Sequence, residues 1–126
     1  MKVFIVEDSA DVLSRLIETF AEIDQVSIVG NADSEFEAIE LILETKPEVV
    51  VLDLQLRKGS GFNVLRILRK ARMTPKVIVL TNHAYDQYFQ QCMAAGADYF
   101  FDKATEFMKV QEVLGGLANG SCDINR

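Results

Sequence analysis

Side chains able to do chemistry stand directly after short apolar segments at four places in this sequence. The groups are Glu7 and Asp8 after residues 3–6, Asp53 after residues 49–52, Thr81 after residues 77–80, and Lys103 shortly after residues 99–101. Three carboxylates brought close together repel one another, so their ionised forms need a compensating positive charge. A hard divalent cation with oxygen ligands supplies that charge, and magnesium suits a site with few carboxylates and several waters.

A magnesium ion in such a site keeps coordination positions for a phosphate. Lys103 would bring a compact positive charge to one phosphate oxygen, and the Thr81 hydroxyl would donate a hydrogen bond to another. Asp53 would then act as the nucleophile, giving an aspartyl phosphate. Taken singly, each group has an ordinary explanation as a helix cap, a turn residue or a solvated charge. Their meeting at one place would indicate phosphoryl transfer, which requires positioning and charge neutralisation.

The apolar segments before these groups are short, continuous, and rich in β-branched and aromatic residues. Continuous apolarity indicates strands covered on both faces, as in a parallel sheet. A weaker strand is expected at residues 26–30. Between the strands, apolar residues recur at three- and four-residue steps, which predicts amphipathic helices. The expected helical stripes are Val12–Phe20, Phe36–Leu43, Phe62–Leu68, Tyr85–Met93 and Phe107–Leu117.

The strict alternation of these segments predicts an α/β fold with five β-α units. We expect a doubly wound, five-stranded parallel sheet of the flavodoxin-like (βα)5 type, with strand order 2-1-3-4-5. In such a sheet, sites form beyond the carboxyl ends of the strands where the strand order reverses. The chemical groups named above should therefore converge at that edge. Ser34 and Glu37 predict the start of the second helix, and Gly96 predicts the end of the fourth.

The chain has 126 residues, enough for one compact domain. We expect this domain to span residues 1–118, with a mobile polar tail over residues 119–126. The net charge of −6 argues against direct nucleic-acid binding. The longest apolar runs fall short of the ~18 residues of a membrane helix. Cys92 and Cys122 are expected to be free thiols in a reducing cytoplasm.

Charge is unevenly distributed along the chain. Residues 57–76 contain seven basic residues and no acidic one, whereas residues 1–48 are rich in acids. We interpret the basic stretch as a solvated helix face rather than a docking patch. The aromatic residues Tyr85, Tyr88 and Phe89 are interpreted as core residues more than as partner contacts, since aromatics at helical spacing are mostly buried.

Together, these residues resemble the receiver domain of bacterial two-component response regulators over about residues 2–118. The resemblance is carried by Phe4–Asp8, Val50–Leu54, Gly61, Val79–Thr81 and Gly96–Asp98 leading to Lys103. It implies a signalling phosphoacceptor that catalyses its own phosphorylation and dephosphorylation. The phosphoryl donor would be the phosphohistidine of a sensor histidine kinase or of a histidine phosphotransfer protein.

The resemblance also implies roles for the acidic residues. Asp53 would be the phosphorylated residue and a ligand of Mg²⁺. Asp8 would bind the ion directly, and Glu7 would act largely through water. The backbone carbonyl of Gln55 would be a further ligand.

The resemblance also implies which residues would bind the phosphoryl group, set the rate of dephosphorylation and change conformation on phosphorylation. Thr81 would bind the phosphoryl group, and Lys103 would pair with it. Gln55 and His83 would tune the rate of dephosphorylation. Thr81 would move toward the phosphoryl group, and the switch residue Phe100 would fill the vacated space. The surface of the fourth helix, fifth strand and fifth helix would change and be recognised by a downstream protein that the sequence does not name.

The chain departs from the family's pattern at several positions. Arg57 stands where the family often has Pro, Asn82 is larger than usual, and Phe100 lacks the hydroxyl of the usual Tyr. Ala104 stands where a cis Pro commonly follows the Lys, which leaves the geometry of that peptide bond open.

Alternative functions remain open from the sequence. The chain would be a stand-alone regulator, monomeric or weakly dimeric, without a membrane partner. It would otherwise be the regulatory receiver segment of a larger DNA-binding regulator or hybrid kinase. A binding module that is not phosphorylated and a flavin-binding electron carrier of similar topology rank lower.

Overall fold

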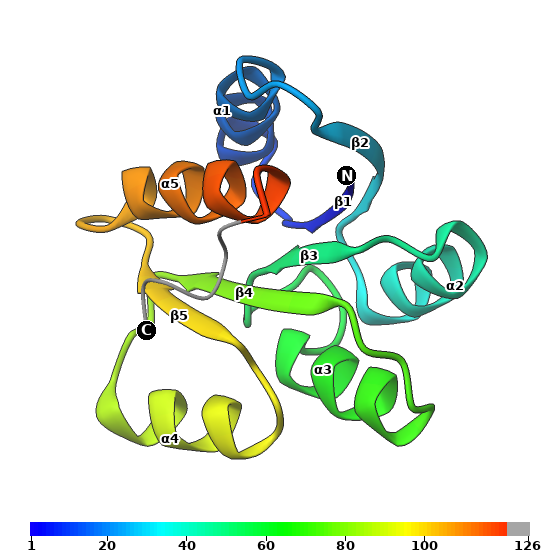
Figure 1. Ribbon diagram of the computed structural model, residues 1–126. Coiled ribbons are helices and arrows are strands. Elements are labelled where there is room, and N and C mark those ends of the chain that lie inside the picture. The colour runs from blue at the N-terminus through cyan, green and yellow to red at the C-terminus, as the bar shows by residue number, and fades with distance from the viewer. Residues whose placement is uncertain (121–126) are drawn as a thin grey trace.

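The protein forms a single parallel sheet with helices on both faces (Figure 1), seen in a computed structural model that describes residues 1–120. The strands are β1 (Lys2–Val6), β2 (Ser27–Ala32), β3 (Val49–Leu52), β4 (Lys76–Thr81) and β5 (Tyr99–Asp102). The helices are α1 (Ala10–Ala21), α2 (Glu35–Thr45), α3 (Gly61–Lys70), α4 (Asp86–Ala94) and α5 (Phe107–Ala118). All neighbouring strands pair in parallel, in the order β2-β1-β3-β4-β5. The predicted fold class and strand order are therefore confirmed.

Two hydrophobic cores lie on the two faces of the sheet. Figure 1 shows α1 and α5 on one face and α2, α3 and α4 on the other. Alternate residues of each strand belong to opposite cores: Val50 and Leu52 pack under α2 and α3, whereas Val49 and Val51 pack under α1 and α5. Because the central strand β3 is buried on both sides, its sequence is continuously apolar rather than alternating.

The edge strand β2 and the helix α2 differ from the sequence predictions. β2 begins and ends later than residues 26–30, because a half-exposed edge strand lacks the continuous apolar signal of a central one. In α2 the buried residues are Ala38 and Ile42. Phe36, which we expected on the buried stripe, is 74% exposed. The small side chain of Ala38 lets α2 approach the sheet. A prediction based on the spacing of large apolar residues does not identify Ala38 as buried.

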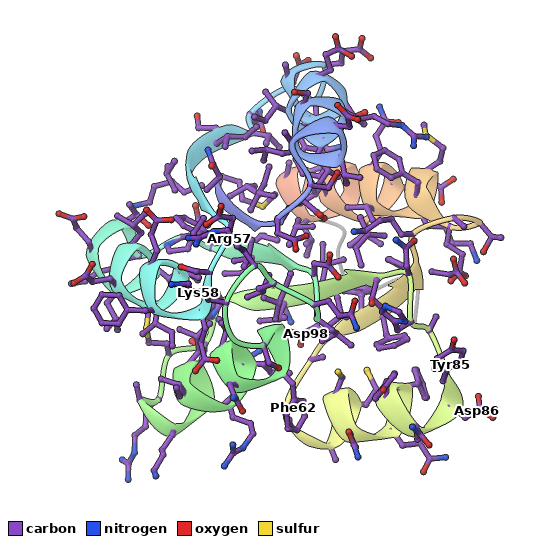
Figure 2. The ribbon with its side chains drawn as sticks, turned by 180° about the vertical axis from the view of Figure 1, so that it is seen from behind. Arg57, Lys58, Phe62, Tyr85, Asp86 and Asp98 are labelled. Carbon is purple, nitrogen blue, oxygen red and sulfur yellow. The ribbon has the colours of Figure 1, made fainter. Side chains whose placement is uncertain are left out.

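The interpretation of the α4 aromatics as core residues is wrong for two of the three. Tyr85 precedes the helix and is 61% exposed, and Phe89 is 44% exposed. Cys92 is the buried residue of this helix, while Tyr88 is half-buried. Figure 2 shows Tyr85 and Asp86 at the beginning of α4, away from the rest of the molecule.

The predicted helix ends are confirmed. The Ser34 hydroxyl accepts a hydrogen bond from the backbone N–H of Glu37 at 3.4 Å. Gly96 follows α4 with φ of +106°, a left-handed conformation that favours glycine. α5 ends at Ala118. Most of the predicted tail, residues 121–126 with Cys122, lies outside the described residues.

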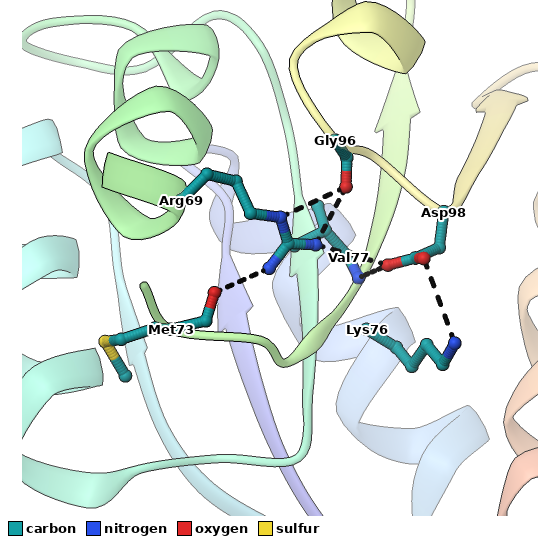
Figure 3. Close-up of polar contacts among 6 residues, drawn as sticks. All are labelled: Arg69, Met73, Lys76, Val77, Gly96 and Asp98. Atoms are coloured by element: carbon teal, nitrogen blue, oxygen red, sulfur yellow. Dashed lines mark hydrogen bonds and ion pairs between the residues drawn. The ribbon is translucent and has the colours of Figure 1, made fainter. Parts of the chain in front are cut away.

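A polar network around Arg69 braces the sheet at the edge opposite the strands' carboxyl ends (Figure 3). The Arg69 guanidinium donates to the carbonyls of Gly96 and Met73 and to the Asp98 carboxylate. Asp98 also accepts from the backbone N–H of Val77 at 2.9 Å. The Gly96–Asp98 motif noted in the sequence therefore joins α3 to the beginnings of β4 and β5. It holds the scaffold and is not part of the predicted site. None of the helices in the described part of the chain is long and apolar enough to span a bilayer.

Candidate functional site

Backbone hydrogen bonds extend the sheet one residue beyond its strands and thereby place the acidic groups. The N–H of Glu7 donates to the carbonyl of Ala32 at 3.0 Å, and the N–H of Asp53 donates to the carbonyl of Val6 at 3.0 Å. The N–H of Lys103 donates in the same way to Thr81. The carboxyl ends of β1, β3 and β5 are thus brought to one edge of the sheet, as the topology requires.

Lys103 lies between two of the predicted site carboxylates. Its Nζ is 2.9 Å from Oε1 of Glu7 and 2.9 Å from Oδ2 of Asp53. All three side chains are buried. Every buried side-chain polar atom within the described residues has a hydrogen-bond partner, so the polar atoms of this cluster satisfy one another. Hydrogen bonds to charged groups in such surroundings are stronger than those between neutral groups.

The electrostatics of the cluster follow from burial and mutual charge. Burial raises the pKa of Glu7, and the neighbouring charge of Asp53 adds to this effect, while the hydrogen bond from Lys103 opposes it. Burial would lower the pKa of Lys103, but its hydrogen bonds and charge attraction to Asp53 and Glu7 outweigh burial, so that pKa is raised. Lys103 is therefore a firmly charged cation at neutral pH.

The carboxylates of Glu7, Asp8 and Asp53 form a donor set that fits a divalent cation. One oxygen from each lies within 4.8 Å of the others. Three ionised carboxylates and one ammonium (Lys103) give −3 + 1 = −2, the charge that one Mg²⁺ would balance. Asp8 is exposed and forms the solvent side of the set, whereas Glu7 and Asp53 are buried. Oxygen ligands with open access for water suit magnesium.

A small cavity opens above these groups. Its volume is about 170 Å³, and its lining residues are Glu7, Asp8, Ser9, Val12, Asp53, Gln55, Asn82, His83 and Lys103. The predicted rate-tuning residues Gln55 and His83 both belong to this lining, Gln55 as an exposed side chain and His83 as a half-buried one. A larger hollow of about 570 Å³ shares Asp8, Gln55 and His83 and continues toward α4.

Thr81 is fully buried and is not one of the residues that line this cavity. Its hydroxyl oxygen accepts a hydrogen bond from the backbone N–H of His83 at 3.0 Å. The accepted bond leaves the hydroxyl proton free to be donated elsewhere. The peptide bonds of the described residues are all trans, including the bond between Lys103 and Ala104 that the sequence left open.

Phe100 lies on the same face of the sheet as Thr81. Phe100 pairs with Val79, and Thr81 is two residues further along β4. The Phe100 ring meets the ring of Phe89 in α4 edge to face, with centroids 5.5 Å apart and an interplanar angle of 85°. Tyr99 packs in the opposite core, as its offset by one strand position predicts. The predicted switch residue therefore contacts α4 directly.

The loop between β3 and α3 is fastened to the beginning of α2 by contacts that sequence reasoning missed. Arg57 donates two hydrogen bonds to the Asp33 carboxylate, each at 3.0 Å. The Glu35 carboxylate accepts from the backbone N–H of Ser60 at 3.0 Å. Figure 2 shows Arg57 beside α2. These acids lie more than twenty residues from their partners, and neither carries a local sequence signal of this role.

Gly61, a marker in the sequence, makes a close approach to the residues at the end of β3. A Cβ at this position would lie 1.9 Å from the backbone carbonyl oxygen of Asp53, so only glycine fits without displacing that carbonyl. The N–H of Gly61 also donates to the carbonyl of Leu54. The beginning of α3 is thereby packed tightly against the residues that follow β3.

A parallel (βα)5 sheet with three acids, a threonine and a lysine at its carboxyl edge defines a receiver domain. The chain matches the response regulator receiver domain over residues 3–114, and it belongs to this family. It is thus a receiver domain of two-component response regulators.

Among characterised relatives, the sensory transduction protein LytT of Bacillus anthracis is 36% identical over 115 residues, which cover 88% of this chain and 45% of that protein. The chain spans about half the length of the curated relatives it matches. A LuxR-family response regulator from Staphylococcus aureus has the same fold, with a TM-score of 0.85, 24% identity, and coverage of 94% of this chain and 98% of that one. The response regulator domain of Thermotoga maritima CheB also has this fold. Its TM-score is 0.82 and its sequence identity is 22%, and the match covers 100% of this chain and 98% of that one.

Proposed function

We propose that Asp53 is the phosphoryl acceptor of this receiver and that the cluster around it catalyses the transfer. The observation that carries the proposal is the position of Asp53, which lies in a small cavity with its Oδ2 held 2.9 Å from the Lys103 ammonium. An isolated buried carboxylate would be protonated and a poor nucleophile. The neighbouring ammonium of Lys103 lies close enough to offset the cost of burying a negative charge on Asp53.

In the transfer step, a carboxylate oxygen of Asp53 forms a bond to the phosphorus of a phosphohistidine. The phosphorus–nitrogen bond of the donor breaks, and the electron pair returns to the histidine ring. The product is an aspartyl phosphate. Little covalent chemistry is required of the protein beyond this nucleophile, because phosphoryl transfer depends mainly on positioning and charge neutralisation.

Lys103 and Thr81 would stabilise the transferred group. Lys103 already contacts an Asp53 oxygen, so its ammonium is placed to pair with a phosphoryl oxygen attached there. The Thr81 hydroxyl is buried at the end of β4, the strand that neighbours β3, and has a proton to donate. Both interactions strengthen as charge accumulates on the equatorial oxygens, which is the condition for lowering a barrier.

Glu7, Asp8 and Asp53 would hold Mg²⁺, with the backbone carbonyl of Gln55 as a further ligand. The bound ion would neutralise charge on the phosphoryl oxygens. Glu7 would then exchange part of its interaction with Lys103 for the ion. The support for an ion here is geometric, since one oxygen of each of the three carboxylates lies within 4.8 Å of the others.

Autodephosphorylation would follow from attack of water on the same phosphorus. Gln55 and His83 line the cavity and are exposed and half-buried, respectively, so a water that attacks the phosphorus would meet them. Bulk and polarity at these two positions would therefore set the lifetime of the phosphorylated state.

Phosphorylation would be read out through Phe100. A movement of Thr81 toward the phosphoryl group frees space on the face that Phe100 shares, and Phe100 contacts Phe89 of α4. The shift would change the surface formed by α4, β5 and α5. Only a few kcal/mol of preference for one packing is needed to move such an equilibrium.

The partners would be a sensor histidine kinase or a histidine phosphotransfer protein on the input side and a downstream protein on the output side, in the cytoplasm. A second candidate is a receiver that regulates further domains of a larger DNA-binding regulator, because the matched relatives are about twice as long as the matched region. The native gene length distinguishes the two.

The acceptor proposal is tested by intact-mass spectrometry after incubation with acetyl phosphate. The chain should gain one phosphoryl group with Mg²⁺ present and fail to gain it with chelator. Asp53→Asn should remain unmodified, whereas the matched control Asp24→Asn, which changes an exposed acid outside the cavity, should be modified normally. Equal modification of Asp53→Asn and the native chain would refute the assignment.

A further inference from the structure

The outer surface of α2 and α3 combines exposed apolar residues with unpaired charges of opposite sign. Phe36 and Leu43 on α2 are 74% and 46% exposed, and Ile67 on α3 is 38% exposed. These residues lie on two neighbouring helices on the same face of the sheet (Figure 1). Burial of an aromatic ring as exposed as that of Phe36 would be favourable, with a free energy of roughly 25 cal/mol per Å² of apolar surface removed from water.

The arrangement of residues across this surface follows from helix geometry and from one contact. The side of α2 that carries Glu35 faces α3, because Glu35 accepts hydrogen bonds from the Ser60 N–H and the Asn63 amide. An α-helix turns by roughly 100° per residue. Around α2 in the direction away from α3, the order is therefore Ile39, Leu43, Phe36, Glu40 and Glu44.

The same reasoning applies to α3. Ile67 lies one turn after Asn63, on the side of α3 that faces α2. Further around the exposed side come Lys70 and Arg66, both exposed. The combined surface therefore has three zones. Glu40 and Glu44 form an acidic zone on the outer side of α2, Phe36, Leu43 and Ile67 form an apolar zone in the middle, and Arg66 and Lys70 form a basic zone on the outer side of α3.

These charges have no opposite charge to pair with inside the described part of the chain. Neither Glu40 nor Glu44 takes part in an ion pair there. Arg66 donates only to the neutral amide of Asn63 and lies above the Phe62 ring at 6.0 Å, and Lys70 has no carboxylate within reach. Charges of one sign on one helix and of the other sign on its neighbour leave the surface polarised.

We infer that this α2–α3 surface binds a second copy of the same chain about a two-fold axis that runs along its apolar centre, parallel to the two helices. A rotation about this axis places the acidic side of one copy over the basic side of the other, twice. Phe36, Leu43 and Ile67 of both copies would be covered at the same time. A surface ordered acid, apolar, base is self-complementary under this operation, which is the reason for preferring a second copy to an unrelated partner.

The association is independent of the proposed phosphoryl chemistry. The acceptor cavity lies at the carboxyl edge of the sheet, and none of its lining residues belongs to the acid, apolar or base groups of the α2–α3 surface. A dimer of this kind leaves the cavity and the α4–β5–α5 surface open to other proteins. Failure of the dimer therefore says nothing about Asp53, and failure of Asp53 phosphorylation says nothing about the dimer.

A charge-exchange experiment tests the inference with the full 126-residue chain. Sedimentation equilibrium of the native chain from about 10 µM to about 1 mM covers the range of weak association. One variant carries Glu40→Lys and Glu44→Lys, and another carries Arg66→Glu and Lys70→Glu. Each variant by itself should be monomeric, since like charges then face each other at both contacts. An equimolar mixture of the two should form a dimer, because both contacts regain opposite charges.

Further measurements separate this dimer from other forms of association. Phe36→Ser should weaken dimerisation at least tenfold. The matched control Glu18→Lys in α1 with Glu22→Lys directly after that helix makes the same charge change elsewhere and should dimerise like the native chain. Circular dichroism of every variant verifies that it is folded. A native chain that stays monomeric over the whole range overturns the inference, as does a dimer insensitive to Phe36→Ser or a mixture that fails to associate.

Discussion

The ammonium of Lys103 lies 2.9 Å from Oδ2 of Asp53, although fifty residues separate them along the chain. The same ammonium lies equally far from Oε1 of Glu7. Without a metal ion, Lys103 is therefore the cation that makes this buried acidic cluster tolerable. The same side chain would later pair with the phosphoryl group, so stability and function depend on one ion cluster.

Lys103→Met should destabilise the metal-free chain by about 3 kcal/mol at neutral pH, because removal of one partner from a buried ion cluster leaves uncompensated charge. The pKa of Glu7 is raised by burial, so a protonated Glu7 favours the folded state. The variant also lacks the Lys103 hydrogen bond that lowers the pKa of Glu7, so the loss of stability relative to the native chain should be smallest in acid and should grow as pH rises through the pKa of Glu7. Denaturant titrations at several pH values measure this.

Lys109→Met is the matched control for that variant. Lys109 pairs with Glu106 at 3.0 Å, but the pair is exposed, so its loss should cost less than about 1 kcal/mol. Equal stability of the two variants at neutral pH would contradict a central role of Lys103 in the cluster.

Thr81→Val should slow phosphorylation of the chain roughly tenfold, the equivalent of about 1.4 kcal/mol for one hydrogen bond lost in the transition state. Valine has nearly the shape of threonine, so the buried site stays filled, but it neither accepts the His83 N–H bond nor donates to a phosphoryl oxygen. Thr81→Ser keeps the hydroxyl and should recover most of the rate. Stopped-time phosphorylation assays distinguish the two, and equal rates for both variants would show that the hydroxyl has no part in transfer.

Gly61→Ala should lower stability by about 1–3 kcal/mol, because the new Cβ would meet the Asp53 carbonyl oxygen and force the backbone apart. Displacement of Asp53 should also slow its phosphorylation. Gly115→Ala on α5 is the control, since nothing lies within 4 Å of its added Cβ, and an alanine there should stabilise the helix slightly. Thermal melts that rank the two alanine variants in the reverse order would be inconsistent with the tight packing at Gly61.

Cys92 should resist alkylation in the native state. Burial raises the pKa of its thiol to about 11, from an ordinary value of 9.0, which lowers the thiolate fraction roughly a hundredfold at pH 8. A raised pKa in the folded state also means that the thiol favours folding below pH 9 and loses this contribution as pH rises toward 11. In a Cys122→Ser background, labelling with iodoacetamide should be at least a hundredfold slower in buffer than in denaturant. Labelling at similar rates would mean that α4 opens readily.

The fold was predictable because its strands carry an unambiguous signal. Residues buried on both faces of β3 give a continuous apolar run, and the strand bounds Val49–Leu52 were read correctly. The position of the site was predictable from the topology. In a parallel sheet the residues that follow β1, β3 and β5 all lie at the same edge, where the strands have their carboxyl ends. The convergence of Glu7, Asp53 and Lys103 is therefore a consequence of strand order that the sequence alone predicts.

Other features were beyond the reach of the sequence because they depend on pairing between distant segments. The Asp33–Arg57 pair and the Glu35–Ser60 contact join loops through side chains that look like ordinary surface charges. The exposure of Phe36 has the same origin. Its apolar character suggested burial, but Ala38 occupies the buried face of α2. Patterns of large apolar residues do not reveal which small residue allows close packing.

The central claim, phosphorylation of Asp53, is tested most directly by locating the modified residue. The chain is incubated with acetyl phosphate and Mg²⁺ and then treated with borohydride, which reduces an aspartyl phosphate to homoserine. Peptide mass spectrometry should find homoserine at position 53 and unchanged aspartate at Asp8, and the conversion should require Mg²⁺. Homoserine at Asp8 instead, or conversion at neither residue in a folded, Mg²⁺-loaded chain, would contradict the account.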